Sequence, residues 1–171
     1  FAGLRALATP TDAVGRMWRL GDELREFRGD AHIAAAAAAG FSGCQLQVLT
    51  ERCAGMPPLS YAAGRGWDAD QLAAAESALR TRGLLDGDVA TDPGCAAREA
   101  IETETDRLCA PMVEALGDDV VELVGRLQEW GAAIRAAHGY YPSSPQLAVL
   151  APGVDEWMIA HGLAPFGGDE S

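Results

Sequence analysis

Apolar residues recur with a helical period along most of the chain. Near the start, the helical spacing of Val14, Met17, Trp18, Leu24 and Phe27 predicts a helix over 12–27. The segment 28–30 contains a glycine, and we expect it to interrupt this helix. Asp30 is then predicted to cap a second, short helix over 31–39, which Gly40 ends.

The next segment carries two helices with strong start signals. Ser42 precedes an apolar run and predicts a helix over 43–54. Pro57 and Pro58 then require a loop, because proline lacks an N–H donor and disfavours a helix before it. Asp68, with Gln71 three residues later, forms a capping-box pattern and predicts a helix over 69–82. The buried face of that helix is expected to carry Leu72, Ala75 and Leu79.

A β-hairpin and two long helices follow. Two short apolar runs flank Asp86-Gly87, which is typical of a hairpin over 84–91. A helix is predicted over 94–116, and Gly117 separates it from another that ends at about 137. Apolar positions in this last helix step by four and three, a seam suited to packing along another long helix. The domain is therefore expected to span 1–138, with 139–171 as linker and C-terminal arm.

Composition agrees with a helical globular protein and excludes some classes. The 171 residues are 49% hydrophobic and 22% charged, which argues against global disorder. No apolar run approaches the ~20 residues that span a bilayer, so no membrane partner is expected. No signal-peptide pattern is present, and Phe1 in place of Met indicates a processed or truncated chain. These patterns alone predict a mostly helical domain and no function.

The charge is distributed unevenly along the chain. The net charge is −12, and all 13 basic residues are Arg. Residues 1–82 hold nine Arg and nine acidic residues, whereas residues 83–171 hold four Arg and sixteen acidic residues. Because acidic surfaces repel nucleic acid, contact with DNA is disfavoured for the second half and remains open for the first.

Cysteine and histidine spacing predicts neither a metal site nor a cofactor. Cys44 and Cys53 are expected on one helix about 13 Å apart, too far for a disulfide. We expect all four cysteines, which include Cys95 and Cys109, to be reduced thiols in the cytoplasm. His32, His138 and His161 lack metal-ligand spacing. No nucleophile elbow, phosphate-binding loop or zinc-protease motif is present, so no enzyme is predicted.

One order of elements resembles a known family. A helix that ends in Arg82-Gly83-Leu84-Leu85, followed by a hairpin that ends in Thr91-Asp92-Pro93-Gly94, resembles the winged helix-turn-helix of MarR-type regulators over about 12–137. The segments 24–32, 66–67 and 105–108 are also similar to the C-terminal half of the actinobacterial SCO6745-like proteins. The resemblance implies a mainly α fold, with a winged helix-turn-helix and a small hairpin wing followed by long helices. It also implies a homodimeric regulator that binds duplex DNA and responds to a small molecule.

In that family the helix 69–82 would lie in the major groove. The DNA-binding candidates on or beside it are Arg65, Gln71, Ser77, Arg80 and Arg82. Asp70 lies on the same helix, and Asp86 and Asp88 occupy the hairpin tip, where a carboxylate near a phosphate weakens binding. An alternative therefore stays open: a winged-helix scaffold that no longer binds DNA and serves as a protein-interaction or small-ligand-binding module.

A second group of polar and aromatic residues could hold a small ligand. The candidates are Trp18, Arg25, Arg28, Asp30, His32 and Trp67. Two Arg, two acidic residues and a His within eight positions could form a polar pocket. The alternative interpretation is an ion-paired junction between helices. An enzyme that uses Arg28, Asp30 and His32 would require these side chains to converge in an open cleft.

Overall fold

The computed structural model describes residues 2–136, 159–160 and 162. The chain divides into two compact units, residues 1–111 and 112–171, and each is described by itself. The C-terminal arm predicted over 139–171 lies almost entirely outside the described residues.

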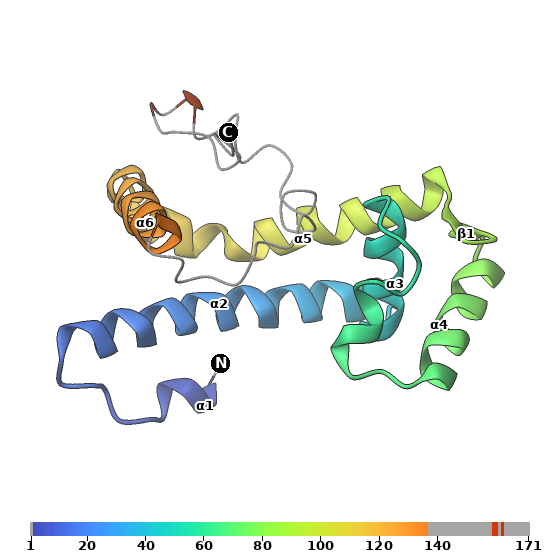
Figure 1. The fold of residues 1–171 in the computed structure, drawn as a ribbon, viewed down its shortest axis with the longest axis horizontal. Helices are drawn as coiled ribbons and strands as arrows, with labels where there is room; N and C mark the ends of the chain where they lie inside the picture. Colours follow the sequence, from blue (N-terminus) through green and yellow to red (C-terminus); the bar gives the residue numbers. More distant parts are fainter. Residues whose placement is uncertain (1, 137–158, 161, 163–171) are drawn as a thin grey trace. The chain divides into compact units, whose positions relative to one another are not determined.

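Helices and one hairpin build the first unit. It begins with α1 (Ala2–Arg5), α2 (Ala13–Ala38), α3 (Gly43–Cys53), the 3-10 turn η1 (Ala62–Arg65) and α4 (Ala69–Thr81). Strands β1 (Leu85–Asp86) and β2 (Val89–Ala90) pair antiparallel, with Leu85 opposite Ala90. Helix α5 (Asp92–Leu116) begins in this unit and crosses its boundary. Figure 1 shows α3, α4 and the hairpin grouped at one end of α2.

Capping boxes start α3 and α4, as the sequence pattern predicts. The Ser42 hydroxyl accepts a hydrogen bond from the Gln45 N–H at 3.2 Å, and the Gln45 Oε1 accepts one from the Ser42 N–H at 2.9 Å. Asp68 and Gln71 repeat the arrangement at 2.8 and 3.0 Å. Each box satisfies N–H groups that have no partner within the helix. The helices predicted over 43–54 and 69–82 are therefore confirmed to within one residue.

The core of the first unit lies where α3, α4, α5 and the hairpin meet. Val48 and Leu49 of α3, Leu79 of α4 and Ile101 of α5 are almost completely buried. The predicted buried face of α4 is confirmed, because Leu72, Ala75 and Leu79 are its buried residues. Burial of each such side chain contributes about 1.5–3 kcal/mol.

The predicted break at 28–30 is wrong. Helix α2 runs without interruption from Ala13 to Ala38, and Asp30 lies inside it instead of capping a new helix. A glycine in a helix costs only about 1 kcal/mol relative to alanine. The six alanines from Ala34 to Ala39 are strong helix formers, and Ala35 and Ala36 are buried against the core. Propensity and packing together outweigh the cost of Gly29.

The expectation of four reduced cysteines is also wrong. Cys53 and Cys95 form a disulfide, with their Cα atoms 5.5 Å apart. Cys44 and Cys109 are free and buried, so the excluded pairing of Cys44 with Cys53 is confirmed as absent. The two bonded residues lie 42 positions apart in sequence, and only the tertiary packing of α3 against the start of α5 brings them together.

The second unit contains the end of α5 and α6 (Asp119–Ala136). Gly117, with φ 53°, separates the two helices as predicted. Three large hydrophobic side chains of α6 remain exposed: Leu127, Trp130 and Ile134. Among the described helices, no single one is long and apolar enough to cross a membrane. Helices α2 and α3 reach the length and hydropathy of a membrane span only when they are taken together, and the chain bends by 96° between them.

Candidate nucleic-acid interface

The outer face of α4 is exposed along its whole length. It carries Asp70, Gln71, Ala73, Ala74, Ser77, Arg80 and Thr81, and the opposite face is buried in the core. Three residues separate the end of the helix from the hairpin, and Arg80 contacts Gly87 and Asp88 of the hairpin, so both elements belong to one surface. Two of the DNA-binding candidates, Ser77 and Arg80, thus lie on the outer face, whereas Gln71 lies at its edge, about 180° around the helix from Arg80.

A buried carboxylate fixes the segment that connects α3 to α4. Glu51 has no exposed surface. Its Oε1 accepts a hydrogen bond from the Leu59 N–H at 2.5 Å, and its Oε2 accepts from Tyr61 and Ala62 at 2.8 and 2.9 Å. Leu59 has a positive φ of 62°, which costs energy for a residue other than glycine. Glu51 therefore acts as a clamp that holds this connection in one conformation.

A chain of ion pairs continues from that clamp to the surface. Arg52, also buried, donates to Glu51 at 2.9 Å and to Glu76 of α4 at 2.6 Å. Glu76 in turn accepts from Arg80 at 3.2 Å. The chain ties α3 to α4 and ends at one of the DNA-binding candidates.

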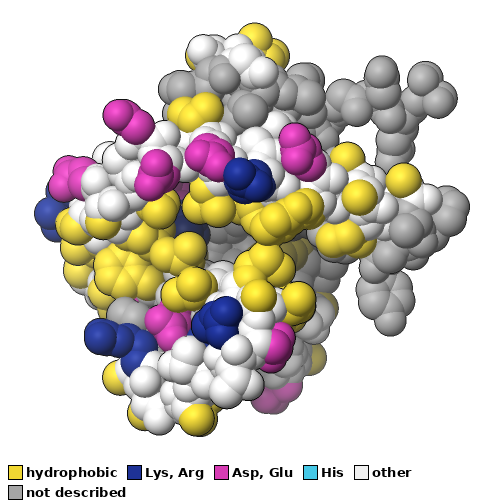
Figure 2. All heavy atoms as spheres, turned by 90° about the vertical axis from the view of Figure 1, so that its left-hand side faces the viewer, with side chains coloured by type: hydrophobic (Ala, Val, Ile, Leu, Met, Phe, Trp, Pro, Cys, Tyr) yellow, Lys and Arg dark blue, Asp and Glu magenta, His cyan; other side chains and the backbone are white. Residues whose placement is uncertain are grey.

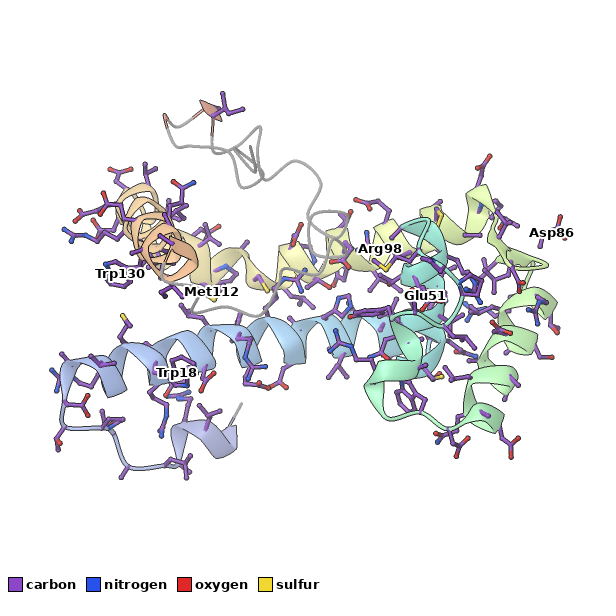
Figure 3. All side chains as sticks on the ribbon, in the orientation of Figure 1. Trp18, Glu51, Asp86, Arg98, Met112 and Trp130 are labelled. Carbon is purple, nitrogen blue, oxygen red and sulfur yellow. A yellow bond between two sulfur atoms is a disulfide. The ribbon has the colours of Figure 1, made fainter. Side chains whose placement is uncertain are left out.

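Arg80 is committed to contacts within the protein. Its Nε donates to the Gly87 carbonyl at 2.9 Å, and an Nη2 donates to Asp88 at 3.3 Å. The guanidinium therefore joins α4 to the hairpin tip. Figure 3 places Asp86 at that tip.

The other two arginine candidates also have partners. Arg82 stacks over the Phe41 ring at 4.0 Å and donates to the Gly40 carbonyl at 3.1 Å. Arg65 stacks over the Tyr61 ring at 4.4 Å and donates to its hydroxyl at 2.7 Å. Both side chains are exposed, so each could exchange these contacts for a phosphate.

Carboxylates outnumber guanidinium groups across this surface. Residues 61–91 contain five acidic residues and three arginines, a net charge of −2. Asp70, Asp86 and Asp88 are exposed. The surface therefore carries an excess of negative charge, which opposes a phosphate backbone.

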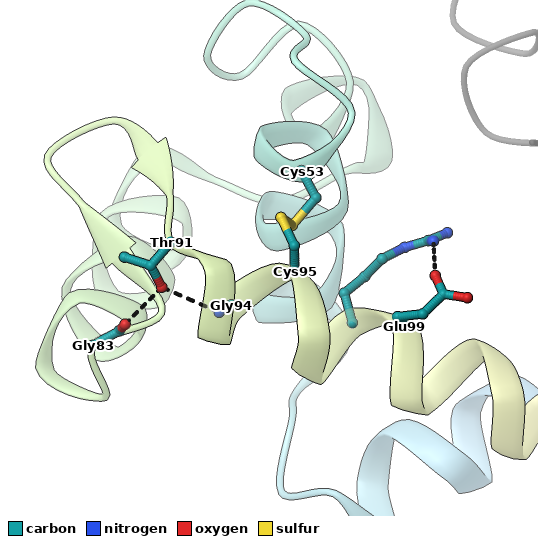
Figure 4. The surroundings of a disulfide bond; sticks show 7 residues. Cys53, Gly83, Thr91, Gly94, Cys95 and Glu99 are labelled. Carbon is teal, nitrogen blue, oxygen red and sulfur yellow. Dashed lines mark hydrogen bonds and ion pairs between the residues drawn. A yellow bond between two sulfur atoms is a disulfide. The ribbon is translucent and has the colours of Figure 1, made fainter.

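The structure explains why a threonine and a glycine follow the hairpin at this spacing. The Thr91 hydroxyl donates to the Gly83 carbonyl at 2.8 Å and accepts from the Gly94 N–H at 3.1 Å (Figure 4). A Cβ atom at residue 94 would overlap the carbonyl oxygen of Leu84. Thr91 thus caps α5 and closes the hairpin, and only glycine fits at position 94.

A surface hollow of about 340 Å³ lies between the N-terminal ends of α3 and α4. Its lining residues are Ser42, Cys44, Gln45, Trp67, Gln71, Ala74 and Ala75. The Trp67 Nε1 donates to Gln47 of α3 at 2.7 Å, so the indole is held in place. Burial raises the pKa of the Cys44 thiol, and the Asp68 carboxylate adds to this rise. The Cys44 sulfur therefore stays protonated near neutral pH.

A polar cluster joins α2 to α5. Glu102 accepts from Arg28 at 2.9 Å and from Arg98 at 2.8 Å. The Thr105 hydroxyl donates to the Ile101 carbonyl at 2.7 Å, so it accepts from the His32 Nδ1, which lies 3.0 Å away. Burial lowers the pKa of His32 from its ordinary value of 6.5, while Glu102 opposes the shift and Arg28 and Arg98 add to it.

The six ligand-binding candidates do not meet at one place. Only Arg28 and His32 share the cluster on Glu102 and Thr105. Trp18 lies 14 positions before His32 on the same helix, about 21 Å along its axis, and it is exposed (Figure 3). Asp30 is rotated by about 200° from both Arg28 and His32. Arg25 pairs with Glu26 at 2.7 Å, and Trp67 lies at the hollow beside α3.

Sequence reasoning missed Glu51, Arg52 and the Cys53–Cys95 pair. Glu51 and Arg52 occupy consecutive positions of a helix, and nothing in their spacing indicates burial. One signal was available. The 15-residue connection between α3 and α4 forms little regular structure, so its buried backbone N–H groups need hydrogen-bond acceptors from elsewhere in the chain.

Comparison with known proteins identifies one family. The profile of a helix-turn-helix family matches residues 1–142, which is most of the chain. No curated protein and no solved structure shows a significant match.

Proposed function

The chain belongs to this helix-turn-helix family, and on that premise we propose that it is a MarR-like winged-helix regulator that binds duplex DNA through α4 and the β1–β2 hairpin. The observation that carries the proposal is the fully exposed outer face of α4, with the hairpin directly after it. Ser77 and Arg80 would face the bases or phosphates from the helix, and Arg65 and Arg82 would flank it. The role is that of a binding protein and not of an enzyme.

The number of available arginines limits the electrostatic part of binding. At most three phosphate contacts per chain come from Arg65, Arg80 and Arg82. Each contact contributes about −0.9 to the slope of log K against log salt, so the slope should not exceed about −2.7 per chain. A steeper slope would require contacts outside this surface.

Fluorescence anisotropy with a labelled duplex from the region upstream of the protein's own gene tests the proposal. We expect binding at low salt that weakens with the shallow slope above. The Arg82→Ala variant should lose affinity at all sequences, and Arg25→Ala is the matched control because Arg25 pairs with Asp22 and Glu26 of its own helix α2. Absence of binding to any such fragment at low salt would reject the proposal.

The proposed regulator is a homodimer. Large hydrophobic side chains stay exposed on α2, notably Val14, Trp18 and Leu20, and hydrophobic side chains are visible on one face in Figure 2. Leu127 and Ile134 of the apolar seam on α6 are exposed as well. We propose that α5, α6 and the C-terminal residues provide the dimer contact. Sedimentation of the Leu127→Glu variant should show monomers where the unmodified chain shows dimers.

Response to a small ligand is part of the same proposal. The hollow beside Trp67 offers about 340 Å³ with an aromatic wall and two alanine side chains, which suits a small apolar molecule. Bound ligand would contact Gln71 and Ala74 on the face of α4 proposed to approach DNA. A Trp67→Phe variant should lose any ligand-dependent change in tryptophan fluorescence, whereas Trp18→Phe should retain it.

One specific observation favours a second function. All three arginine candidates are engaged within the protein, and the surface from residue 61 to 91 has a net charge of −2. These features suit a helix-turn-helix scaffold that binds a basic protein segment or a small ligand in place of DNA. The anisotropy titration separates the two functions, because a scaffold of this kind does not bind DNA even at low salt.

DNA binding implies a location where DNA is present. We therefore propose the cytoplasm for this protein. Because that compartment is reducing, the state of the Cys53–Cys95 disulfide there becomes a separate question.

A further inference from the structure

The Cys53–Cys95 disulfide connects two ends of the proposed DNA-binding surface. Cys53 is the last residue of α3, and Cys95 lies in the first turn of α5 (Figure 4). The two residues are 42 positions apart, and the chain between them contains the connecting segment, all of α4 and the whole hairpin. The bridge therefore closes a loop around the elements proposed to contact DNA.

Besides the bridge, apolar packing near Leu49 holds the start of α5 against α3 in the described part of the chain. The Thr91 hydroxyl donates to the Gly83 carbonyl and accepts from the Gly94 N–H, and all three residues lie within the closed loop. The ion pair of Arg28 with Glu102 and the bond of His32 with Thr105 hold α5 two turns or more beyond Cys95. Cleavage of the bridge would thus release the hairpin base and the first turn of α5 from covalent attachment to α3.

Both bridged residues keep part of their surface exposed. Cys53 and Cys95 are each half-buried, whereas the free Cys44 and Cys109 are buried. Disulfides that form in a reducing compartment, such as the cytoplasm proposed above, are usually transient and either catalytic or redox-sensing. Partial exposure, and a position at the junction of the hairpin and α5, distinguish this bridge from a purely internal crosslink.

We propose that Cys53 and Cys95 form a reversible thiol–disulfide exchange site that controls how rigidly α4 and the hairpin are held. The oxidised form holds the surface in the arrangement described above, and the reduced form loosens it. The consequence for DNA affinity rests on the proposed function. The consequence for the rigidity of residues 54–94 does not.

The chemistry is a two-electron exchange with a dithiol. A thiolate of the dithiol attacks the Cys53 Sγ, the S–S bond breaks, and its electron pair goes to the Cys95 Sγ. Cys95 is the better leaving group because the N-terminal turn of α5 stabilises negative charge, while Cys53 lies at the C-terminal end of α3. The second thiol of the dithiol then attacks the dithiol sulfur that is bonded to Cys53, and the Cys53 Sγ leaves as a thiolate. Both cysteines end as thiols after protonation, and the dithiol becomes a cyclic disulfide.

Thiol counting and stability of the full chain under dithiothreitol test the site without DNA. Under native conditions, dithiothreitol should raise the number of maleimide-reactive sulfurs in the subsequently unfolded chain from two to four. Loop-closure entropy for 42 residues predicts a shift of about a thousandfold in the unfolding equilibrium. Hydrogen exchange of residues 83–95 should accelerate on reduction, and oxidised glutathione should restore both properties.

Variants separate the bridge from the remaining thiols. The Cys44→Ser, Cys109→Ser double variant is the matched control and should retain the whole response. Cys95→Ser should resemble the reduced chain and ignore dithiothreitol. If Cys95→Ser does not fold, the reduced unmodified chain supplies the same comparison. Any of three results would overturn the proposal. The chain could show four reactive sulfurs before reduction, the bridge could resist dithiothreitol until the chain is unfolded, or hydrogen exchange could stay unchanged after reduction.

A DNA titration of both redox forms distinguishes this inference from the proposed function. Tighter binding by the oxidised form supports both. If neither form binds DNA but reduction changes stability and exchange as described, the proposed DNA function fails and the exchange site stands. If both forms bind equally and exchange is unchanged, the exchange site fails and the DNA function stands.

Discussion

Replacement of Glu51 by glutamine should strongly destabilise the protein. Each carboxylate oxygen accepts two hydrogen bonds: Oε1 from Arg52 and Leu59, and Oε2 from Tyr61 and Ala62. An amide keeps one oxygen and replaces the other with an NH₂ group. Two of the four donors would therefore face another donor, with almost no access to water.

The expected loss follows from two estimates that agree. Two hydrogen bonds to a charged acceptor contribute about 1.5–3 kcal/mol each, or about 3–6 kcal/mol together. Removal of one partner from a buried ion pair, here the Glu51–Arg52 pair, costs about 3–5 kcal/mol. We therefore expect Glu51→Gln to lower the free energy of unfolding by about 4 kcal/mol. That loss is a large fraction of the stability of an ordinary domain.

Urea unfolding followed by circular dichroism measures this loss. Glu104→Gln is the matched control, because Glu104 pairs with Arg107 on the exposed side of α5 at 2.7 Å and its loss should leave the midpoint unchanged. A Glu51→Gln midpoint equal to that of the unmodified protein would refute the clamp. A variant already unfolded without urea would agree with it.

Three further outcomes are expected. Gly94→Ala should lower the melting temperature, because the added Cβ atom would overlap the Leu84 carbonyl and overpacking costs about 1–3 kcal/mol. Gly64→Ala is the control and should leave the melting temperature unchanged, because the space around Gly64 is open. Because the pKa of His32 is lower in the folded chain than in the unfolded chain, the unfolded chain binds more protons below pH 6.5. The contribution of His32 to the free energy of unfolding is therefore fully present above pH 6.5 and is lost as the pH falls further. His32→Gln should lack this component when stability is compared across that range. Asp68→Ala should cost about 1 kcal/mol in thermal unfolding through loss of the α4 cap, and equal stability of the two proteins would contradict this.

Local signals predicted most of the fold. Ser42, Asp68 and Gly117 determine helix ends through contacts within four residues, so their effect is visible in the sequence. The buried face of α4 follows from spacing alone. Gly29 misled the prediction because its small local penalty competes with packing of α2 that the sequence does not display.

Contacts between distant residues could not be predicted. Glu102 meets Arg28 across 74 positions, and Cys53 meets Cys95 across 42. Either pairing depends on where α5 lies against the other helices, which the order of elements does not specify. The charged candidates were placed correctly on α4 and its flanks, but their internal partners were not foreseen. Arg80, for example, contacts Gly87 and Asp88 only because the hairpin folds back toward α4.

The engagement of Arg80 weakens DNA binding less than the neighbouring carboxylates do. Exposed ion pairs such as Arg80 with Asp88 contribute about 0.2–1 kcal/mol, so a phosphate can replace them at small cost. The exposed carboxylates of Asp86 and Asp88, in contrast, repel a phosphate backbone that approaches the hairpin tip. The double variant Asp86→Asn, Asp88→Asn should therefore strengthen binding more than Arg80→Ala weakens it, if the hairpin lies against the phosphate backbone. Equal affinity of the double variant and the unmodified protein would place the hairpin away from DNA and leave α4 as the sole contact.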